Sequence, residues 1–578
     1  MYPTTIFNLH DNSVISTDTT IEVANDAPLF LQVFSADKGT EELVEISGSD
    51  FDAMYGTMSF DKHGQSAIQA KNIIDAGGRL LAKRVVADDA KLANVVLCAV
   101  VTAGEDDGVK VKWESKSIEN AKTFDDVKKA AEALYNDGTG VYPLIVCTDN
   151  GRGVSNKAIR LNPDYATSKT IGKTLYNFIV YEGTKIIEQK TVSFDPTVIY
   201  NNNSYRLDEY TNVQVSAKIL DNMFELYAAK IADEIGLEVE DVRTYDIIYG
   251  YTNKGAELAK FKLDETSADL DSTTGIALEK GDNGEFGDAP VNSTAWATKI
   301  KEVFTGAFTD EIWDVDTHKI AAIVDANYPM DVKKAIYDFV TFRKDCVYFR
   351  DYGLDNVDTF LGIKGKYEEF VDQRNCFVAD YCSNYLIQDP VSRKNIKVTM
   401  TYDLSAVLIN HIINNPYAPL AGIANGFILP NAIKGSINFT PVNTPSVNQK
   451  EAIDELRINY AIFEDDNCVV QNCYSSQEEY TQLSYINNTL AIQRVLRAVR
   501  TACPKQRYTL STGSDLTSYA TAVNNVLANY TSNFDVLNFI YAEDPLKTEQ
   551  KIFYASIEFA FLNWAQTEIF DVYAINKN

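Results

Sequence analysis

The chain has little that would place it in or across a membrane. No apolar run among its 578 residues reaches the length that a membrane-spanning helix needs. The first residues, MYPTTIFNLHDNSVIS, contain no basic stretch followed by an apolar one, so they do not resemble a signal peptide. We therefore expect no membrane insertion, and we expect the protein to be made in a cytoplasm.

Histidine and cysteine are scarce and scattered. The sequence has no H-E-x-x-H, G-x-S-x-G or C-x-x-C motif, which argues against a zinc site and favours reduced, mostly buried thiols. A Ser/His/Asp or Cys/His set could arise only through long-range folding, so the sequence predicts no metal, no cofactor and no enzymatic activity. The residues concerned are His10, His63, His318, His411, Cys98, Cys147, Cys346, Cys376, Cys382, Cys468, Cys473 and Cys503.

A phosphate-binding loop is also missing, although two glycine segments resemble one at first sight. Such a loop follows a strand and opens a helix, because the helix N-terminus supplies free N–H groups. Around Gly77-Gly78 the order is reversed, since apolar residues at helical spacing precede the glycines and an aliphatic strand, 80–86, follows them. The Gly-Lys-Thr segment 172–174 has Thr167 where a Walker A loop needs glycine, and an alternating strand follows it. We interpret the paired glycines as a helix-to-strand turn and predict no nucleotide site.

Positive charge is the remaining deficit. The chain has 53 Lys and Arg against 81 Asp and Glu, which gives a formal net charge of −28. Such a chain repels nucleic acid and anionic membranes, so we expect no nucleic-acid partner. The acidic segment GDNGEFGD, 281–288, is predicted to be a turn; it lacks the spacing of a Ca²⁺-binding loop, but whether it binds Ca²⁺ stays open.

Hydrophobic residues make up 45% of the chain, as in a globular protein, and the length allows roughly three to four domains. The strand and helix patterns predict an α/β and α+β multidomain fold, with the polar stretch 264–294 as the clearest boundary. The predicted segments are an N-terminal arm, 1–22; the N-terminal part of the core, 23–100; a strand-rich inserted domain, 101–270; a central α/β domain, 271–440; a C-terminal α+β domain, 441–566; and a C-terminal arm, 567–578.

Local patterns predict individual elements within these segments. Helix and strand alternate after residue 295, which suggests βαβ units. The segment 567–576 alternates like a strand but is apolar on both faces, so we expect it to be buried, and another chain could bury it. The main predicted helices are 123–137, 213–236, 331–345, 407–415 and 478–503; the predicted strands include 319–329 and 376–381; the predicted hairpins are 174–195, which turns at 182–184, and 454–476, which turns at 465–467.

These patterns, in this order, resemble those of contractile tail sheath proteins of bacteriophages and related injection machines. The start, APLFLQVF, DFDAMYG and AIQAKNIIDAGGRLLAKRVV, is similar to the family's strand, F…YG, helix and GG…VV. GRGVSNKAIRLNP with LYNFIVYEG resembles its inserted domain, and GIALEKGDNGEFGD with IVDANYP resembles its central domain. NPYAPLAGIANGFI, INYAIFEDDNCVVQNCYSS and YINNTLAIQRVLRAVR resemble its C-terminal domain.

The resemblance implies a structural subunit, with a central domain that is subtilisin-like in topology only. It implies rings of six that stack helically around a tail tube protein, together with baseplate and tail terminator proteins, in a virion tail assembled in the host bacterial cytoplasm. Contraction would drive the tube through the host envelope for genome ejection. In such a sheath the terminal arms add strands to a neighbour's sheet. The residues then expected at the subunit interface are Ile6, Phe7, Leu9, Ile569, Phe570, Val572 and Tyr573.

Two other classes of protein stay open. An acidic, strand-rich chain also fits a baseplate protein or an adhesin of a virion. A hydrolase that uses the subtilisin-like topology is the second alternative, and it requires a Ser, a His and an Asp to be brought together by the fold.

Overall fold

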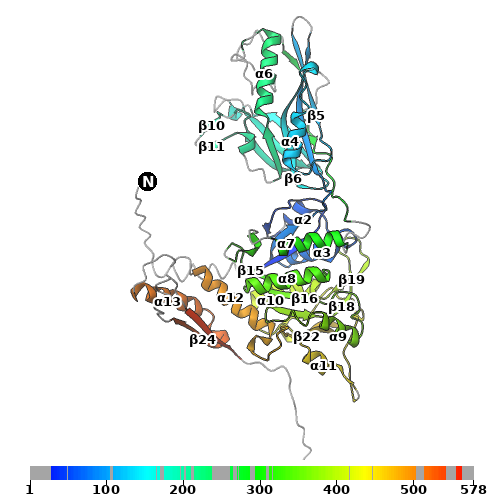
Figure 1. Cartoon of the computed structure of the whole chain (residues 1–578), viewed down its shortest axis with the longest axis vertical. Helices are drawn as coiled ribbons and strands as arrows, with labels where there is room; N and C mark the ends of the chain where they lie inside the picture. Colours follow the sequence, from blue (N-terminus) through cyan, green and yellow to red (C-terminus); the bar gives the residue numbers. More distant parts are fainter. Residues whose placement is uncertain are drawn as a thin grey trace, which may run out of the picture.

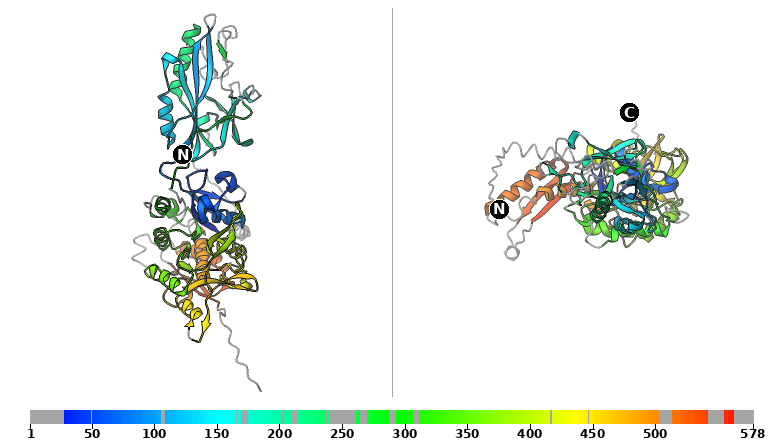
Figure 2. Two further views of the ribbon diagram at one scale, coloured as in Figure 1. Left: turned by 90° about the vertical axis from the view of Figure 1, so that its right-hand side faces the viewer. Right: turned by 90° about the horizontal axis from the view of Figure 1, so that it is seen from above.

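The computed structural model describes residues 28–562, apart from 49, 105–107, 165, 169–174, 196, 201–202, 210–213, 237, 239–260, 264–269, 271, 287–292, 307–310, 316, 416, 446, 503–512 and 542–554. The described chain is elongated (Figure 1). An inserted unit, residues 92–278, extends from one end of a larger core that contains the rest (Figure 2). No helix in the described ranges is long and apolar enough to cross a membrane.

An eight-stranded sheet forms the centre of the core, in the order β2-β3-β1-β15-β16-β17-β22-β23. The six middle strands run parallel, and an antiparallel strand closes each edge. The mixed α/β class and the predicted βαβ alternation are therefore confirmed. The strands are β1 (Leu29–Phe34), β2 (Val44–Ile46), β3 (Arg79–Arg84), β15 (Ile320–Val324), β16 (Val347–Asp351), β17 (Val378–Tyr381), β22 (Ile458–Glu464) and β23 (Asn467–Gln471).

Both faces of this sheet are buried, because successive side chains of each strand point to opposite sides. On β1, Phe30 and Phe34 join the cluster beneath α3 and α10, whereas Leu31 and Val33 pack with α7 and α8 on the other face. The helices of the core are α2 (Asp50–Tyr55), α3 (Phe60–Asp75), α7 (Thr294–Thr305), α8 (Met330–Arg343), α9 (Phe360–Glu369), α10 (Thr401–Asn414) and α11 (Gln449–Glu455), with the short pairs β18 (Asn384–Gln388) and β19 (Asn395–Thr399), and β20 (Asn443–Thr444) and β21 (Val447–Asn448).

Helix α3 leads into β3 through the paired glycines. Gly77 takes the left-handed backbone conformation with φ of 83°, and the amide of Gly78 donates to the carbonyl of Ile73 at 3.0 Å. A Cβ on Gly78 would lie 2.7 Å from Cδ1 of Ile409 on α10, so α10 packs closely against this turn. The predicted helix-to-strand turn is confirmed.

The described part of the inserted unit has two larger sheets, ordered β12-β6-β4-β5-β13 and β14-β7-β8-β9, and the short pair β10-β11. The apolar faces of these sheets and of α6 share one core, and α4 covers the outer side of β4 and β6. Strand β4 runs across residues 100 and 101, where the sequence suggested a domain boundary. The elements are β4 (Leu92–Ala103), β5 (Val109–Lys116), α4 (Phe124–Glu132), β6 (Val141–Arg152), β7 (Lys157–Pro163), β8 (Tyr176–Glu182), β9 (Lys185–Val192), β10 (Ile199–Tyr200), β11 (Asn203–Ser204), β12 (Val215–Ile219), α6 (Asp221–Ile235), β13 (Phe261–Leu263) and β14 (Ile276–Ala277).

The C-terminal part of the described chain contains α12 (Ile486–Ala502), α13 (Gly513–Ala528), β24 (Phe534–Tyr541) and β25 (Ala555–Phe561). The two strands pair antiparallel and pack with the two helices in a separate hydrophobic cluster, at the lower left of Figure 1. Helix α12 is also anchored to the central sheet, since the amide of Gln493 donates to the carbonyl of Cys346 at 3.1 Å.

Most of the predicted elements are confirmed, including the two hairpins and the helices at 123–137, 331–345 and 407–415. The prediction that 213–236 is largely helical is confirmed from Asp221 onwards but not for the residues before it. Residues Val215–Ile219 form β12, which pairs antiparallel with β6, and the helix begins only at Asp221. The alternating Val215, Ala217 and Ile219 fit the two-residue period of a strand.

Candidate functional site

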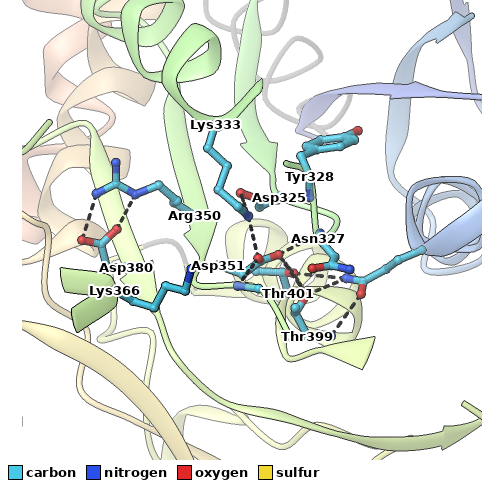
Figure 3. A network of polar contacts seen from close by, with 12 residues as sticks. Asp325, Asn327, Tyr328, Lys333, Arg350, Asp351, Lys366, Asp380, Thr399 and Thr401 are labelled. Carbon is cyan, nitrogen blue, oxygen red and sulfur yellow. Dashed lines mark hydrogen bonds and ion pairs between the residues drawn. The ribbon is translucent and has the colours of Figure 1, made fainter. Parts of the chain in front are cut away.

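A buried polar network lies at the carboxyl ends of the parallel strands of the core. This edge of an open α/β sheet is where enzymes of this class bind their ligands. Asp325 directly follows β15, and Asp351 is the last residue of β16. Figure 3 shows Lys333 of α8 pointing between these two carboxylates.

Lys333 joins the two carboxylates through a pair of short ion pairs. Its Nζ lies 2.7 Å from Oδ2 of Asp325 and 2.6 Å from Oδ1 of Asp351. The side chain of Lys333 is 4% exposed, and those of Asp325 and Asp351 are 0% and 1% exposed. Water is therefore excluded from all three charges, which makes their interactions strong but costly to break.

Both oxygens of Asp351 accept further hydrogen bonds. Oδ2 accepts hydrogen bonds from the amide of Asn327 at 2.9 Å and from the hydroxyls of Thr399 and Thr401 at 2.9 and 3.2 Å. Oδ1 accepts from the amide of Gly353 at 2.8 Å. These donors come from three separate segments of the chain, so the carboxylate holds those segments together.

Both oxygens of Asp325 also accept hydrogen bonds. Its Oδ1 accepts from the amide of Tyr328 at 3.0 Å, and its Oδ2 accepts from the hydroxyl of Tyr348 on β16. The network also includes α3. The side-chain amide of Gln65 donates to the hydroxyl of Thr399 at 2.7 Å, and the side-chain amide of Gln69 donates to the backbone carbonyl of Asp325 at 3.0 Å.

The two carboxyl groups differ in acidity. Burial, together with the negative charge of Asp351, raises the pKa of Asp325 to about 7. Burial alone would also raise the pKa of Asp351, but the Lys333 ammonium and the hydrogen bonds from Asn327 and Thr399 hold it below its ordinary value. The cluster therefore binds one proton near neutral pH, because one lysine compensates only one of two buried carboxylates.

A second buried ion pair lies beside the first. Arg350 donates through Nε and Nη2 to the two oxygens of Asp380, at 2.7 and 3.0 Å. Its guanidinium also lies 3.9 Å from the ring centre of Phe370. Both partners are almost fully buried, and they join the neighbouring strands β16 and β17.

The chemistry of this edge is that of a structural network. General acid–base catalysis requires a titrating group within hydrogen-bond reach of a substrate. Both carboxylates at this edge already accept from protein donors, and their side chains are 0% and 1% exposed. Two pockets of the described chain lie away from this edge: Phe124 and Arg206 of the inserted unit line one, and Met54 of the core and Asn150 of the inserted unit line the other.

Two of the three histidines that the structure describes, His63 and His411, make local contacts. Nε2 of His63 lies 3.1 Å from Oδ1 of Asp37, while its Nδ1 accepts from the amide of Ser59. His411 is hydrogen-bonded to the carbonyl of Ala418 at 3.0 Å, and burial lowers its pKa. Neither histidine belongs to the network around Asp325 and Asp351.

The cysteines of the described ranges are free thiols, and six of the seven are buried. Burial raises the pKa of each of these six to about 12, so the reactive thiolate is not formed at neutral pH. Within the described part, no group of three or more His, Cys, Asp or Glu is placed to hold a metal ion. Cys503 and His10 lie outside the described residues.

The interface residues predicted from the sequence also lie outside the described residues: Ile6, Phe7, Leu9, Ile569, Phe570, Val572 and Tyr573. The same is true of the Gly-Lys-Thr segment 172–174, but the strand expected after it is present as β8. A phosphate loop needs a helix at that place.

Asp325, Lys333 and Asp351 were not among the residues predicted from the sequence. The available signal was a carboxylate directly after an apolar run, in IAAIVD and VYFRD. That signal places two acids at one sheet edge, but it cannot reveal that a lysine from α8 neutralises one of them.

No protein-family model matches the chain, and no curated protein matches it significantly. Several solved structures are similar. The sheath tail protein from Listeria innocua has a TM-score of 0.48 and 10% identity, over 91% of this chain and 92% of that one. The sheath tail protein from Desulfitobacterium hafniense has a TM-score of 0.42 and 9% identity, over 93% and 97%. The contracted sheath of an extracellular contractile injection system has a TM-score of 0.36 and 13% identity, over 48% of this chain and 79% of that one.

Proposed function

We propose that this chain is a structural subunit of a contractile tail sheath, of a phage tail or a related injection machine. The observation that carries the proposal is the order of the elements. Helix α3, the glycine turn and β3 are followed by an inserted strand-rich unit, then by the rest of the parallel sheet, the β22–β23 hairpin and α12. This is the order of the sequence segments that resemble the sheath family.

The proposed assembly is a stack of six-membered rings around a tail tube, bounded by baseplate and terminator proteins, in a virion tail assembled in the host cytoplasm. Subunits related by an open helical symmetry meet through two different surfaces. On contraction, a metastable lattice would shorten and drive the tube through the host envelope. The energy would be stored in packing rather than supplied by a nucleotide.

The small sheet near the C-terminus supports a role for the arms. In the part of the chain that we describe, β24 and β25 pair only with each other, so each strand has an edge without a described neighbour. Val536 and Ile540 on β24 and Leu562 after β25 are exposed. Such edges are ready to accept further strands, and we propose that the arms 1–22 and 567–578 of neighbouring subunits supply them.

The closed carboxyl edge of the central sheet supports a structural role over a hydrolase. Asp325 and Asp351 have the position of catalytic acids in an α/β enzyme, but Lys333 and backbone amides occupy them. The buried network instead stabilises the core that would bear the mechanical load.

Negative-stain electron microscopy of the purified full-length chain tests the proposal. We expect rings or helical tubes, whose formation increases with protein concentration. A baseplate protein or an adhesin would instead give discrete particles of fixed size. Discrete particles at every concentration and salt condition tested would contradict the sheath assignment.

A further inference from the structure

The inserted unit is attached to the core at a narrow waist (Figure 2). The chain enters the unit through residues 85–94, which lead from the end of β3 into the first residues of β4, and returns through residues 279–285, after β14. We call these two stretches the crossing segments. Two units joined in this way normally move relative to each other unless a substantial interface holds them.

The crossing segments are hydrogen-bonded to each other. Lys91 and Asp282 exchange both of their backbone hydrogen bonds, at 2.8 and 3.2 Å, and Asn94 and Glu279 do the same at 2.9 and 3.0 Å. The amide of Gly153, in the loop after β6, also donates to the carbonyl of Lys91 at 2.9 Å. The waist is therefore a short antiparallel ribbon with a third segment bound to it, which is much stiffer than two free linkers.

A loop of the core binds the inserted unit at this waist. We call residues 36–42, which follow β1, the joint loop. Arg152 of the inserted unit donates from Nε and Nη2 to the two oxygens of Glu41, at 2.9 and 2.6 Å. Arg84, which is 1% exposed at the end of β3, donates to the carbonyls of Gly39 and Arg152, at 2.8 and 2.6 Å. One buried guanidinium thus connects the core strand, the joint loop and the inserted unit.

Side chains of the joint loop make two more contacts, one with the inserted unit and one with the second crossing segment. Lys38 forms an ion pair with Glu182 at the tip of the β8–β9 hairpin. Asn283 donates to Asp37 at 3.3 Å and accepts from the amide of Val154 at 3.1 Å. The joint loop therefore contacts three separate segments, and a rotation of the inserted unit would break contacts in all of them.

Glycines allow the backbones to approach closely at this place. A Cβ on Gly151 would overlap the carbonyl oxygen of Gly39 in the joint loop, and a Cβ on Gly281 would overlap that of Gly153. Both overlaps involve backbone atoms, which cannot move aside without displacing the segment. This close approach explains why the segments GRG, 151–153, and GDNG, 281–284, carry glycines.

We infer that the joint loop locks the inserted unit and the core into one rigid body. The inference does not rest on the proposed function. Within a sheath it would mean that the inserted unit follows every rotation of the core during contraction instead of flexing at the waist.

Distance measurements between spin labels test the lock. Labels carried by noncanonical amino acids, placed at exposed Leu226 on α6 and Leu361 on α9, report across the waist without using the native thiols. We expect one narrow distance distribution in the wild-type chain. A broad or multiple distribution in the wild-type chain would overturn the inference.

Two variants test whether the joint loop causes the rigidity. Gly151→Ala should push the inserted unit away from Gly39. Arg152→Ala should remove the side-chain contact with Glu41 without displacing the backbone. We expect each to widen the distribution at least twofold. Arg79→Ala is the matched control, because it removes an arginine–carboxylate pair with Glu45 on the core surface, away from the waist. Widths unchanged in both joint variants would overturn the role of the joint loop.

Discussion

At the scale of single residues, Lys333 is the side chain on which the buried network depends most. Replacement by methionine keeps much of the volume but leaves two buried carboxylates without a counter-charge. Breaking a buried pair in this way costs about 3–5 kcal/mol. We expect Lys333→Met to lower the free energy of unfolding of the core by an amount in this range, measured by chemical denaturation.

Lys299→Met is the matched control for this prediction. Lys299 also contacts two carboxylates, Asp88 and Glu302, but on an exposed surface, where ion pairs contribute little. It should leave the unfolding transition almost unchanged. Equal effects of the two variants would show that the buried network does not carry the expected energy.

The protonation of Asp325 predicts a pH dependence of stability. Its pKa in the folded protein is about 7, above its ordinary value of 3.8, so the folded state binds this proton more tightly than the unfolded chain does. Its contribution to stability is therefore complete below pH 3.8 and is lost as the pH rises through about 7.

Unfolding curves of Asp325→Asn and of the wild-type chain across this pH range separate that contribution from all others. We expect the wild-type chain to lose stability relative to Asp325→Asn as the pH rises towards 7. Asp338→Asn on the exposed side of α8 should keep the wild-type profile. A wild-type profile in Asp325→Asn would contradict the assignment of the proton to this residue.

Single residues also show why the candidate site could not be read from the sequence. The strand before Asp325 was predicted, within 319–329, whereas β16, which ends in Asp351, was not predicted, although it is also a short apolar run. The partners of the two carboxylates were not predictable, since Thr399 is 48 residues from Asp351 and Gln65 is 334 residues from Thr399. No local pattern encodes a contact of that range.

At the scale of elements, turns and hairpins were predicted from the sequence because the residues that determine them are adjacent in the chain. The turn between α3 and β3 was predictable because helical spacing, two glycines and an aliphatic strand are adjacent in sequence. The hairpin β22–β23 was also predicted, but not its place in the central sheet. That place depends on the parallel pairing of β22 with β17, in which Asp380 is opposite Ile458. Pairing between segments so far apart leaves no periodic trace.

The α3–β3 turn also gives a prediction for packing between elements. Gly78→Ala would place a methyl group 2.7 Å from Cδ1 of Ile409, and overpacking of this kind costs typically about 1–3 kcal/mol. Ile409→Val removes that Cδ1 atom and should cost about 0.5–1.5 kcal/mol alone, as truncations of this type do.

The double variant Gly78→Ala/Ile409→Val should therefore be more stable than the sum of the two single effects allows, because residues in contact couple. Gly77→Ala is the control. It is strained by its φ of 83° but meets nothing within 4 Å, so its effect should add to that of Ile409→Val. Additive effects in the first pair, measured by thermal unfolding, would contradict the described contact.

At the scale of the whole molecule, the division of the chain followed from the ordered resemblance more than from composition. Strand β14 and the second crossing segment lie within the polar stretch 264–294, which the sequence offered as a boundary. The predicted boundary at residue 100 falls inside β4, in an apolar run that continues without interruption. Composition cannot locate a boundary that a continuous buried strand crosses, so these divisions stay predictions.

The last prediction concerns assembly through the C-terminal arm. Residues 567–576 alternate like a strand, and a lone strand is not stable in water. The described chain offers the edges of β24 and β25 as a place for added strands. If the arm pairs with a neighbouring subunit, truncation after Thr567 should leave the melting temperature of the monomer unchanged and abolish polymerisation, as followed by sedimentation and electron microscopy.

The competing arrangement is an arm that pairs with β25 of its own chain. The truncation would then remove part of the monomer's own sheet and lower its melting temperature. Ile569→Asp with Val572→Asp is a second variant that keeps the full length of the chain. Strand addition between subunits predicts that it stays folded and monomeric, because two buried apolar contacts are replaced by unpaired charges. A variant that still polymerises, or one whose monomer melts lower, would contradict the proposed exchange of arms.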